Sequence, residues 1–161
     1  MKAIFIAGTP AMGKTYIGDY LEKHYNYSHL NLSNFEKTII SSSEKDEFKR
    51  RFEELIQQAN PIVITWGFGP LTPSHQDILQ YILDKSTLVW FDGNREFARK
   101  AFSERGGIDT GEFDAQIKQL DESKIVSKLN PIVINTFRED GSYRDTEDVV
   151  REIHRLTGSN S

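Results

Sequence analysis

A short loop near the start of the chain carries residue types that bind phosphate. Residues 8–15 read GTPAMGKT and match the pattern G-x-x-x-x-G-K-[S/T] at every fixed position. In such a loop the backbone N–H groups point at a phosphate, and Gly8 and Gly13 stand where a Cβ would block that approach. The Lys14 ammonium is placed for the β- and γ-phosphates of a nucleotide, and the Thr15 hydroxyl is placed for Mg²⁺. The motif therefore predicts a site for a nucleotide with Mg²⁺.

The loop stands between a strand and a helix, which is the context that this chemistry requires. Residues 1–7 (MKAIFIA) form an apolar run typical of a buried strand, while residues 14–25 place Ile17, Leu21 and Tyr25 at helical spacing. The alternative is a Gly-rich turn that matches by chance, and the complete motif in the right context favours the phosphate loop. The whole loop is predicted to contact the nucleotide, with Lys14 also catalytic and Thr15 also the metal ligand: Gly8, Thr9, Pro10, Ala11, Met12, Gly13, Lys14 and Thr15.

The rest of the chain alternates between short apolar runs and amphipathic stretches. Strands that alternate with helices imply right-handed crossovers and a parallel sheet covered on both faces. We expect a three-layer α/β fold with five parallel strands, whose ligands bind at the carboxyl ends of the strands. The further predicted strands are 28–32, 61–66, 87–91 and 131–135, and the further predicted helices are 44–59, one starting at Thr72 and Pro73, 94–103, 112–128 and one capped by Asp145.

The composition restricts the class of protein. With 161 residues, 20 Lys or Arg and 24 Asp or Glu, the chain has a formal net charge of −4. It is predicted to form one domain over residues 1–158, followed by a tail at 159–161. No apolar run reaches the roughly 18 residues of a membrane span, and the lack of cysteine excludes disulfides, thiolate catalysis and Cys-bound zinc. We expect a cytoplasmic protein that binds small ligands and no membrane, with nucleic acid disfavoured.

Segments beyond the loop resemble small P-loop kinases. Residues 64–79 (ITWGFGPLTPSHQDIL) are similar to the C-S-A-L-K-x-x-Y-R-D-x-L stretch of gluconate kinases, and residues 66–69 (WGFG) to the D-G-F-P segment of nucleoside monophosphate kinases. Residues 91–105 (FDGNREFARKAFSER) resemble the strand, helix and arginine-bearing lid of both groups. Residues 113–123 (FDAQIKQLDES) resemble the S-Q-x-x-x-L-E helix of gluconate kinases. Together with shikimate kinase, these families imply a P-loop NTPase fold, ATP with Mg²⁺ as the phosphoryl donor, and a small lid at about 104–125.

The same resemblance places arginines near the transferring phosphate. Arg99 and Arg105 are the predicted catalytic residues, because a planar guanidinium can bind two phosphate oxygens at once. Arg95 and Lys100 are nearby substitutes for this role. For each of these residues, a solvated helix face is an equally good interpretation.

The resemblance also implies that the acceptor lies beyond the second strand. Asn31, Ser33 and Glu36 are predicted to bind it, although the Asp that related kinases often use there as a base is missing. The pattern S-x-x-E equally fits a capping box, which is the favoured alternative for Ser33 and Glu36. Thr65 and Trp66 end the third strand and complete the predicted substrate-binding set.

The usual Walker B acidic residue is also missing. Thr65 and Trp66 stand at the end of the third strand, where related kinases have a carboxylate. Either Thr65 or Asp92 is expected to act in the outer shell of Mg²⁺, and a turn-stabilising role is preferred for Asp92.

Two further segments carry cations. Residues 136–141 (TFREDG) correspond to the adenine-contacting loop of the resembling families, which implies that Arg138 stacks on the base, and turn formation is the alternative. Residues 49–51 (KRR) can bind an anionic acceptor, although such a run is more often a solvated helix face.

Three functions are compatible with these residues. The favoured one is an ATP-dependent kinase that transfers the γ-phosphoryl group to a small molecule, which is a sugar-like hydroxyl compound, a nucleoside or a nucleotide. A kinase acting on a nucleic-acid end or a modified base is disfavoured by the acidic net charge. A nucleotide-binding switch or NTPase without an acceptor is supported by the missing acidic residues and disfavoured by the arginine-rich lid.

Overall fold

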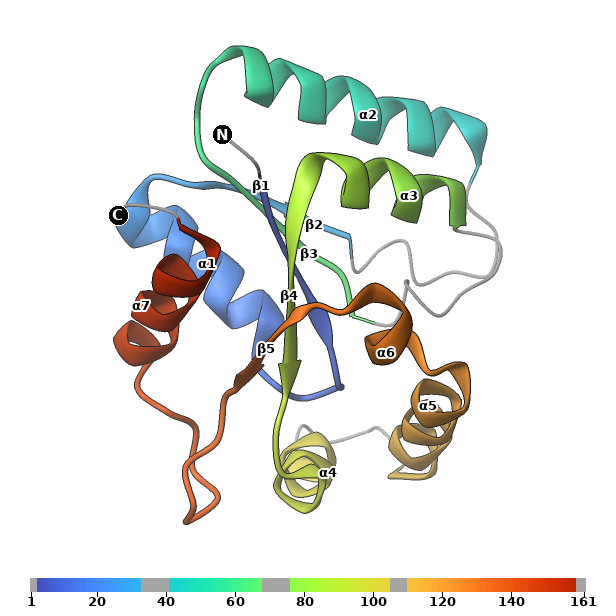
Figure 1. Ribbon diagram of the computed structural model, residues 1–161, viewed down its shortest axis with the longest axis vertical. Coiled ribbons are helices and arrows are strands. Elements are labelled where there is room, and N and C mark those ends of the chain that lie inside the picture. Colours follow the sequence, from blue (N-terminus) through green and yellow to red (C-terminus); the bar gives the residue numbers. More distant parts are fainter. Residues whose placement is uncertain (1–2, 33–40, 68–75, 105–109, 159–161) are drawn as a thin grey trace.

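Five short strands form one parallel sheet at the centre of the molecule (Figure 1). The computed structural model describes residues 3–32, 41–67, 76–104 and 110–158. The strand order is β2-β3-β1-β4-β5, and all four neighbouring pairs are parallel, as the sequence predicts. The strands are β1 (Ala3–Gly8), β2 (Ser28–Asn31), β3 (Ile62–Thr65), β4 (Ser86–Asp92) and β5 (Ile132–Asn135).

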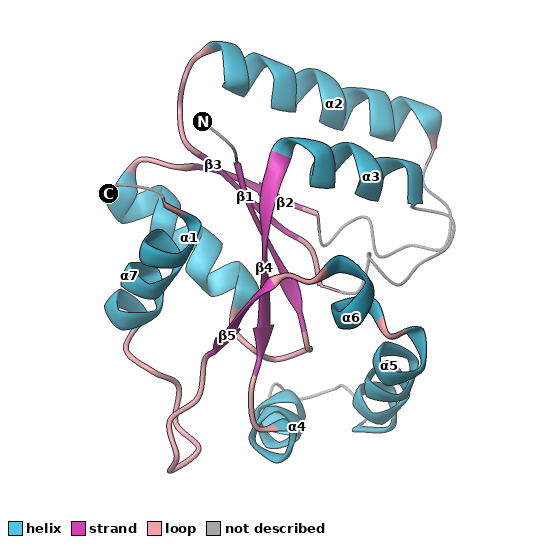
Figure 2. Cartoon of the chain, viewed as in Figure 1, coloured by secondary structure: helices cyan, strands magenta, loops and turns pink. Residues whose placement is uncertain are grey.

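Helices cover both faces of this sheet (Figure 2). Helices α1 and α7 pack on one face, and α2 and α3 pack on the other, so the predicted three-layer α/β architecture is confirmed. None of the described helices is both long and apolar enough to cross a membrane. The helices are α1 (Lys14–Tyr25), α2 (Ser42–Gln57), α3 (Gln76–Lys85), α4 (Arg95–Glu104), α5 (Thr110–Ser123), α6 (Ile125–Leu129) and α7 (Thr146–Thr157).

The central strand β1 contributes to two hydrophobic clusters because its side chains alternate between the faces. Ile4 and Ile6 belong to the cluster under α1 and α7, while Phe5 and Ala7 belong to the cluster under α2 and α3. All four side chains are buried, as expected for an apolar run inside a parallel sheet. The phosphate loop, residues 8–15, begins at the last residue of this buried strand.

The helix predicted over residues 112–128 is wrong in one respect, because the structure has two helices there. Lys124 adopts a left-handed conformation with φ 54°, which ends α5 and starts α6. The Ser123 hydroxyl donates to the carbonyl of Leu120 at 2.7 Å and accepts from the Ile125 amide at 3.2 Å, which satisfies backbone groups at the break. The break allows Leu120 and Ile125 to pack into one cluster.

The predicted capping role of Asp145 is also wrong. Helix α7 does begin directly after Asp145, but this carboxylate makes no capping hydrogen bond. It accepts instead from the Arg138 guanidinium at 2.9 Å, so that it ties the preceding loop to the helix. The helix start predicted at Thr72 and Pro73 lies outside the described residues.

Polar groups join α1 to α7 where the two helices meet. The hydroxyls of Tyr20 and Tyr25 both donate to the Glu147 carboxylate, the second at 2.6 Å. These hydrogen bonds lower the pKa of Glu147 and raise the pKa of Tyr20 to about 12. The Tyr27 hydroxyl lies 3.1 Å from Nε2 of His154, and burial lowers the pKa of this histidine.

The buried His154 predicts a loss of stability at mildly acidic pH. Because its folded-state pKa is below the value of about 6.5 in the unfolded chain, the unfolded chain takes up the proton first as pH falls. Stability therefore decreases as pH drops through about 6.5 and levels off below the folded-state pKa. Urea unfolding near pH 7.5 and pH 5.5 should show a smaller loss for His154→Gln than for wild type. Equal losses would remove His154 from this pH dependence.

Candidate phosphate-transfer site

The phosphate loop is pressed against the end of strand β4. Gly8 has φ 135°, and a Cβ on it would lie 2.2 Å from the carbonyl oxygen of Phe91. The Thr9 amide donates to that same oxygen at 3.0 Å. Gly13 has φ 84° and open space around its Cβ position. Gly8 thus makes room for a neighbouring strand, while the predicted role of both glycines in leaving room for phosphate stays a prediction.

Two side chains brace the interior of the loop. The Lys14 ammonium donates to the carbonyl oxygens of Thr9 at 2.7 Å and Gly8 at 3.2 Å. The Thr9 hydroxyl donates to Oδ1 of Asp92 at 3.2 Å, and that oxygen also accepts from the Gly93 amide at 2.9 Å. Asp92 therefore has the predicted turn-stabilising role and in addition holds the loop to β4.

A cavity of about 410 Å³ opens beside the loop, toward the start of α7. This size suits a nucleoside. The Tyr143 hydroxyl donates to the Ala11 carbonyl at 2.6 Å, which joins the loop after β5 to the phosphate loop. Tyr16 follows the motif directly and is 63% exposed. The cavity is lined by Met12, Gly13, Tyr16, Ile17, Thr136, Tyr143, Arg144, Thr146 and Val149.

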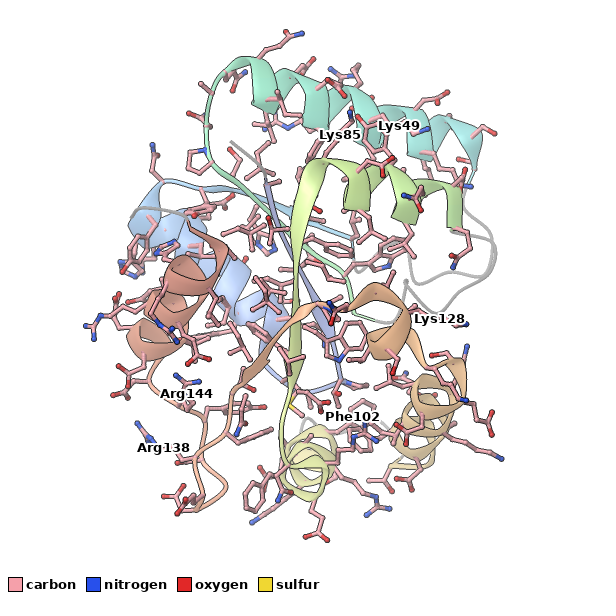
Figure 3. The ribbon with its side chains drawn as sticks, in the orientation of Figure 1. Lys49, Lys85, Phe102, Lys128, Arg138 and Arg144 are labelled. Atoms are coloured by element: carbon pink, nitrogen blue, oxygen red, sulfur yellow. The ribbon has the colours of Figure 1, made fainter. Side chains whose placement is uncertain are left out.

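The arginine at this cavity is Arg144 rather than the predicted Arg138. Arg138 donates to Asp145 and, at 3.4 Å, to the Ser142 hydroxyl, and it is not among the lining residues. Arg144 donates to the Asn135 carbonyl at 2.7 Å and lines the cavity. Figure 3 shows both arginines on the loop between β5 and α7. Sequence reasoning missed Arg144, Tyr143 and Tyr16, and only Tyr16 carried a signal, since an aromatic residue directly follows the motif.

Arg99, which is predicted to lie near the transferring phosphate, and its predicted substitute Arg95 form ion pairs between α4 and α5. Arg99 donates to both oxygens of Asp114, at 3.0 and 3.2 Å, which raises the pKa of Arg99. Arg95 makes the equivalent pair with Asp121, at 2.8 and 2.9 Å. Lys100 is exposed on α4, and the catalytic candidate Arg105 lies outside the described residues. The predicted lid thus includes a helix, α5, that ion pairs hold against α4.

A second cavity, of about 450 Å³, lies between β2 and α2. It includes Asn31 from the predicted acceptor set and Arg51 from the basic run. The other two acceptor candidates beyond the second strand, Ser33 and Glu36, lie outside the described residues. The cavity is lined by His29, Leu30, Asn31, Leu32, Ser43, Glu44, Glu47, Phe48 and Arg51.

The two candidates at the end of β3 are both buried. Trp66 is 1% exposed and packs in the cluster under α2 and α3, because it lies on the same side of the chain as Ile64. Trp66 is not among the residues that line either of the two cavities, and its predicted role in substrate binding stays a prediction. Thr65 is also 1% exposed, and its hydroxyl lies 2.6 Å from Nε2 of His29.

The donor set of the site fits Mg²⁺. Within the described ranges, no group of three or more His, Asp or Glu side chains could hold a metal ion. The exposed Thr15 hydroxyl in the first turn of α1 is an oxygen donor that could bind the ion, with phosphate oxygens and water completing the shell. Such a shell is typical of Mg²⁺, which prefers oxygen ligands and keeps several waters.

Solved structures share this fold over almost their whole length. A shikimate kinase from Acinetobacter baumannii in complex with shikimate is similar with a TM-score of 0.63 at 16% identity, covering 100% of this chain and 95% of that one. A gluconokinase from Sinorhizobium meliloti 1021 is similar with a TM-score of 0.60 at 16% identity, covering 98% and 94%. The chain has the fold of the small P-loop kinases.

The predicted resemblance to shikimate and gluconate kinases is thereby confirmed at the level of the fold. A tunicamycin resistance protein from Deinococcus radiodurans is also similar, with a TM-score of 0.65 at 11% identity, covering 99% of this chain and 98% of that one. No protein-family model matches the sequence, and no curated protein sequence matches it significantly.

Proposed function

We propose that this protein is an ATP-dependent kinase that transfers the γ-phosphoryl group to a small molecule. The observation that carries this proposal is the phosphate loop after the central strand β1, with one cavity toward each edge of the sheet. The nucleoside-sized cavity adjoins the loop after β5, and the second cavity adjoins β2, at the opposite edge of the sheet. A triphosphate that starts in the first cavity and runs along the loop would direct its γ-phosphate toward the second.

On the donor side, the backbone, Lys14 and Thr15 of the phosphate loop would have separate roles. Backbone N–H groups of residues 8–15 and the amino end of α1 would bind phosphate oxygens. The Lys14 ammonium would exchange its carbonyl partners in the loop for the β- and γ-phosphates. Mg²⁺, held by Thr15 and the phosphates, would neutralise negative charge on the triphosphate.

The acceptor side offers orientation more than a strong base. Asn31 can position a hydroxyl, and the Arg51 guanidinium can attract an anionic group. Glu47 lines the same cavity, but its hydrogen bond from Arg50 lowers its pKa and makes it a weak proton acceptor. A loose phosphoryl-transfer transition state needs no strong base, so this site is compatible with a sugar-like hydroxyl compound, a nucleoside or a nucleotide.

Two cations of the basic run on α2, Lys49 and Arg50, support a small acceptor over a nucleic-acid end. Arg50 pairs with Glu47 and Glu54 on its own helix. The Lys49 ammonium lies 5.2 Å from the ring centre of Tyr81, and the Lys85 ammonium lies 5.1 Å from the same ring centre. Figure 3 labels both lysines. These cations are engaged with carboxylates and an aromatic ring, whereas a nucleic-acid surface presents its cations to phosphates.

The proposal is tested by incubating the protein with ATP, Mg²⁺ and pools of polyols, nucleosides, nucleotides or oligonucleotides. Mass spectrometry should detect one compound of the first three pools that gains a phosphate. Phosphorylation confined to oligonucleotides would replace the proposal with the nucleic-acid alternative, and ATP hydrolysis without any phosphorylated product would favour an NTPase or switch. Absence of ATP·Mg²⁺ stabilisation in a thermal shift assay would contradict all three functions.

Tyr16 is expected to contribute to nucleotide affinity. Its ring lines the first cavity and is largely exposed, so that its removal costs little folding stability. Loss of a base-stacking aromatic weakens binding by about tenfold. Titration with ADP should show this loss for Tyr16→Ala and near wild-type affinity for Tyr16→Phe. Lys23→Ala, on an exposed position of the same helix, is the control, and an equal effect in this variant would refute a specific role for Tyr16.

A further inference from the structure

A chain of hydrogen bonds connects solvent with the buried end of strand β3. Nδ1 of His29 lies 2.9 Å from Oδ1 of Asp19, and its Nε2 lies 2.6 Å from the Thr65 hydroxyl. The Asp19 side chain is 69% exposed, whereas the His29 side chain is 3% exposed. The imidazole therefore connects an exposed carboxylate on α1 with the hydroxyl of Thr65.

The chemistry of the three groups fixes where their protons lie when the imidazole is neutral. A carboxylate can only accept, so Nδ1 of His29 carries the proton that faces Asp19. In the neutral ring Nε2 is then the acceptor, and the Thr65 hydroxyl donates its proton to it. The Thr65 oxygen is left with lone pairs alone for any other partner. Donation along a hydrogen-bond chain also makes that oxygen a stronger acceptor.

The imidazole that contacts Thr65 packs against Gly18 of α1, the helix that begins with the phosphate-loop residues Lys14 and Thr15. A Cβ on Gly18 would lie 2.4 Å from Nε2 of His29, the atom that contacts Thr65. Gly18 follows Thr15 by three residues, so the two share a helix face one turn apart. Thr65 also pairs in register with Ile6, two residues before the phosphate loop begins.

We propose that Asp19 and His29 are positioning residues that hold the Thr65 hydroxyl as a hydrogen-bond acceptor for the hydrated Mg²⁺–nucleotide. This inference rests on the proposed function. Thr65 is the last residue of β3, a strand end without a carboxylate, and the chain of three groups gives its hydroxyl the acceptor-only character that a carboxylate has. A merely structural role, in which His29 only ties β2 to α1 and β3, is the alternative that the test addresses.

The binding test compares nucleotide affinity with and without Mg²⁺, using ADP as the probe. Thr65→Val keeps the shape of the side chain and removes the hydroxyl. We expect its ADP affinity in EDTA to remain at the wild-type value, while the tightening caused by Mg²⁺ decreases about fivefold, as for one lost hydrogen bond. Asp19→Ala should show about half of this decrease in Mg²⁺-dependent tightening, on a logarithmic scale, because the tautomer of His29 is no longer fixed.

Glu22→Ala is the matched control for Asp19→Ala. Glu22 also lies on α1 and accepts from the backbone amide of His29 at 2.8 Å, but it makes no hydrogen bond to the imidazole. Its removal should leave the Mg²⁺-dependent tightening unchanged. Equal losses in Glu22→Ala and Asp19→Ala would show a structural role and overturn the inference.

A spectroscopic measurement tests the same arrangement without nucleotide. Long-range ¹H–¹⁵N NMR of the imidazole should show the Nδ1–H tautomer of His29 in wild type and in Thr65→Val, and a shift toward Nε2–H in Asp19→Ala. A wild-type Nε2–H tautomer, or full Mg²⁺-dependent tightening in Thr65→Val, would overturn the inference while leaving the proposed function in place. Failure of the wild-type protein to bind nucleotide at all would instead refute the proposed function.

Discussion

Replacing Lys14 with alanine is expected to abolish phosphoryl transfer. The Lys14 ammonium is the cation of the phosphate loop, where it donates to the carbonyl oxygens of Gly8 and Thr9. Negative charge on the β- and γ-phosphates redistributes during transfer, and a fixed positive group beside them stabilises the transition state. Loss of such a group lowers kcat by about 100-fold to 1,000-fold. The rate of product formation, measured at saturating ATP with the acceptor found in the screen, checks this expectation.

The fold should tolerate Lys14→Ala, because the side chain is only half-buried. Urea unfolding and circular dichroism of the variant should therefore match wild type within about 1 kcal/mol. Lys23→Ala, an exposed lysine on the same helix, is the control and should keep full activity. A Lys14→Ala enzyme with wild-type kcat would remove the phosphate loop from the mechanism.

The second large effect concerns the fold, and it arises at Gly8. A Cβ at this position would lie 2.2 Å from the carbonyl oxygen and 2.7 Å from the amide nitrogen of Phe91, both backbone atoms of the neighbouring strand. The φ of 135° is also one that L side chains rarely adopt. Strand β4 is buried in the centre of the sheet, so neither strand can move away without disturbing the core. Gly8→Ala is expected to destabilise the protein by about 4 kcal/mol or more, measured by urea unfolding.

Gly13→Ala is the matched comparison for Gly8→Ala. Gly13 belongs to the same loop and has a positive φ of 84°, but a Cβ there would meet no described atom within 4 Å. Only backbone strain remains, and the expected destabilisation is about 1–2 kcal/mol. Similar free energies of unfolding for the two variants would show that contact with β4 is not what requires glycine at position 8.

Several features of this protein were determined by the sequence alone. The motif of residues 8–15 reports a local backbone geometry, because its glycines and its flanking strand and helix are contiguous in the chain. Alternating apolar runs and amphipathic stretches likewise predicted the parallel sheet, since both periodicities come from neighbouring residues. Helices α5 and α6 show the limit of this signal, because a single left-handed residue, Lys124, divides a stretch whose composition suits one helix.

Only the tertiary structure decided which distant residues meet at the site. Thr9 contacts Asp92 across 83 positions, Tyr143 contacts Ala11 across 132, and His29 contacts Thr65 across 36. These pairs depend on the order and register of the strands, which place carboxyl ends side by side irrespective of their separation along the chain. For the same reason Arg144 rather than Arg138 reaches the first cavity, and Trp66 turns into the core: side-chain direction at a strand end follows from the sheet and what covers it.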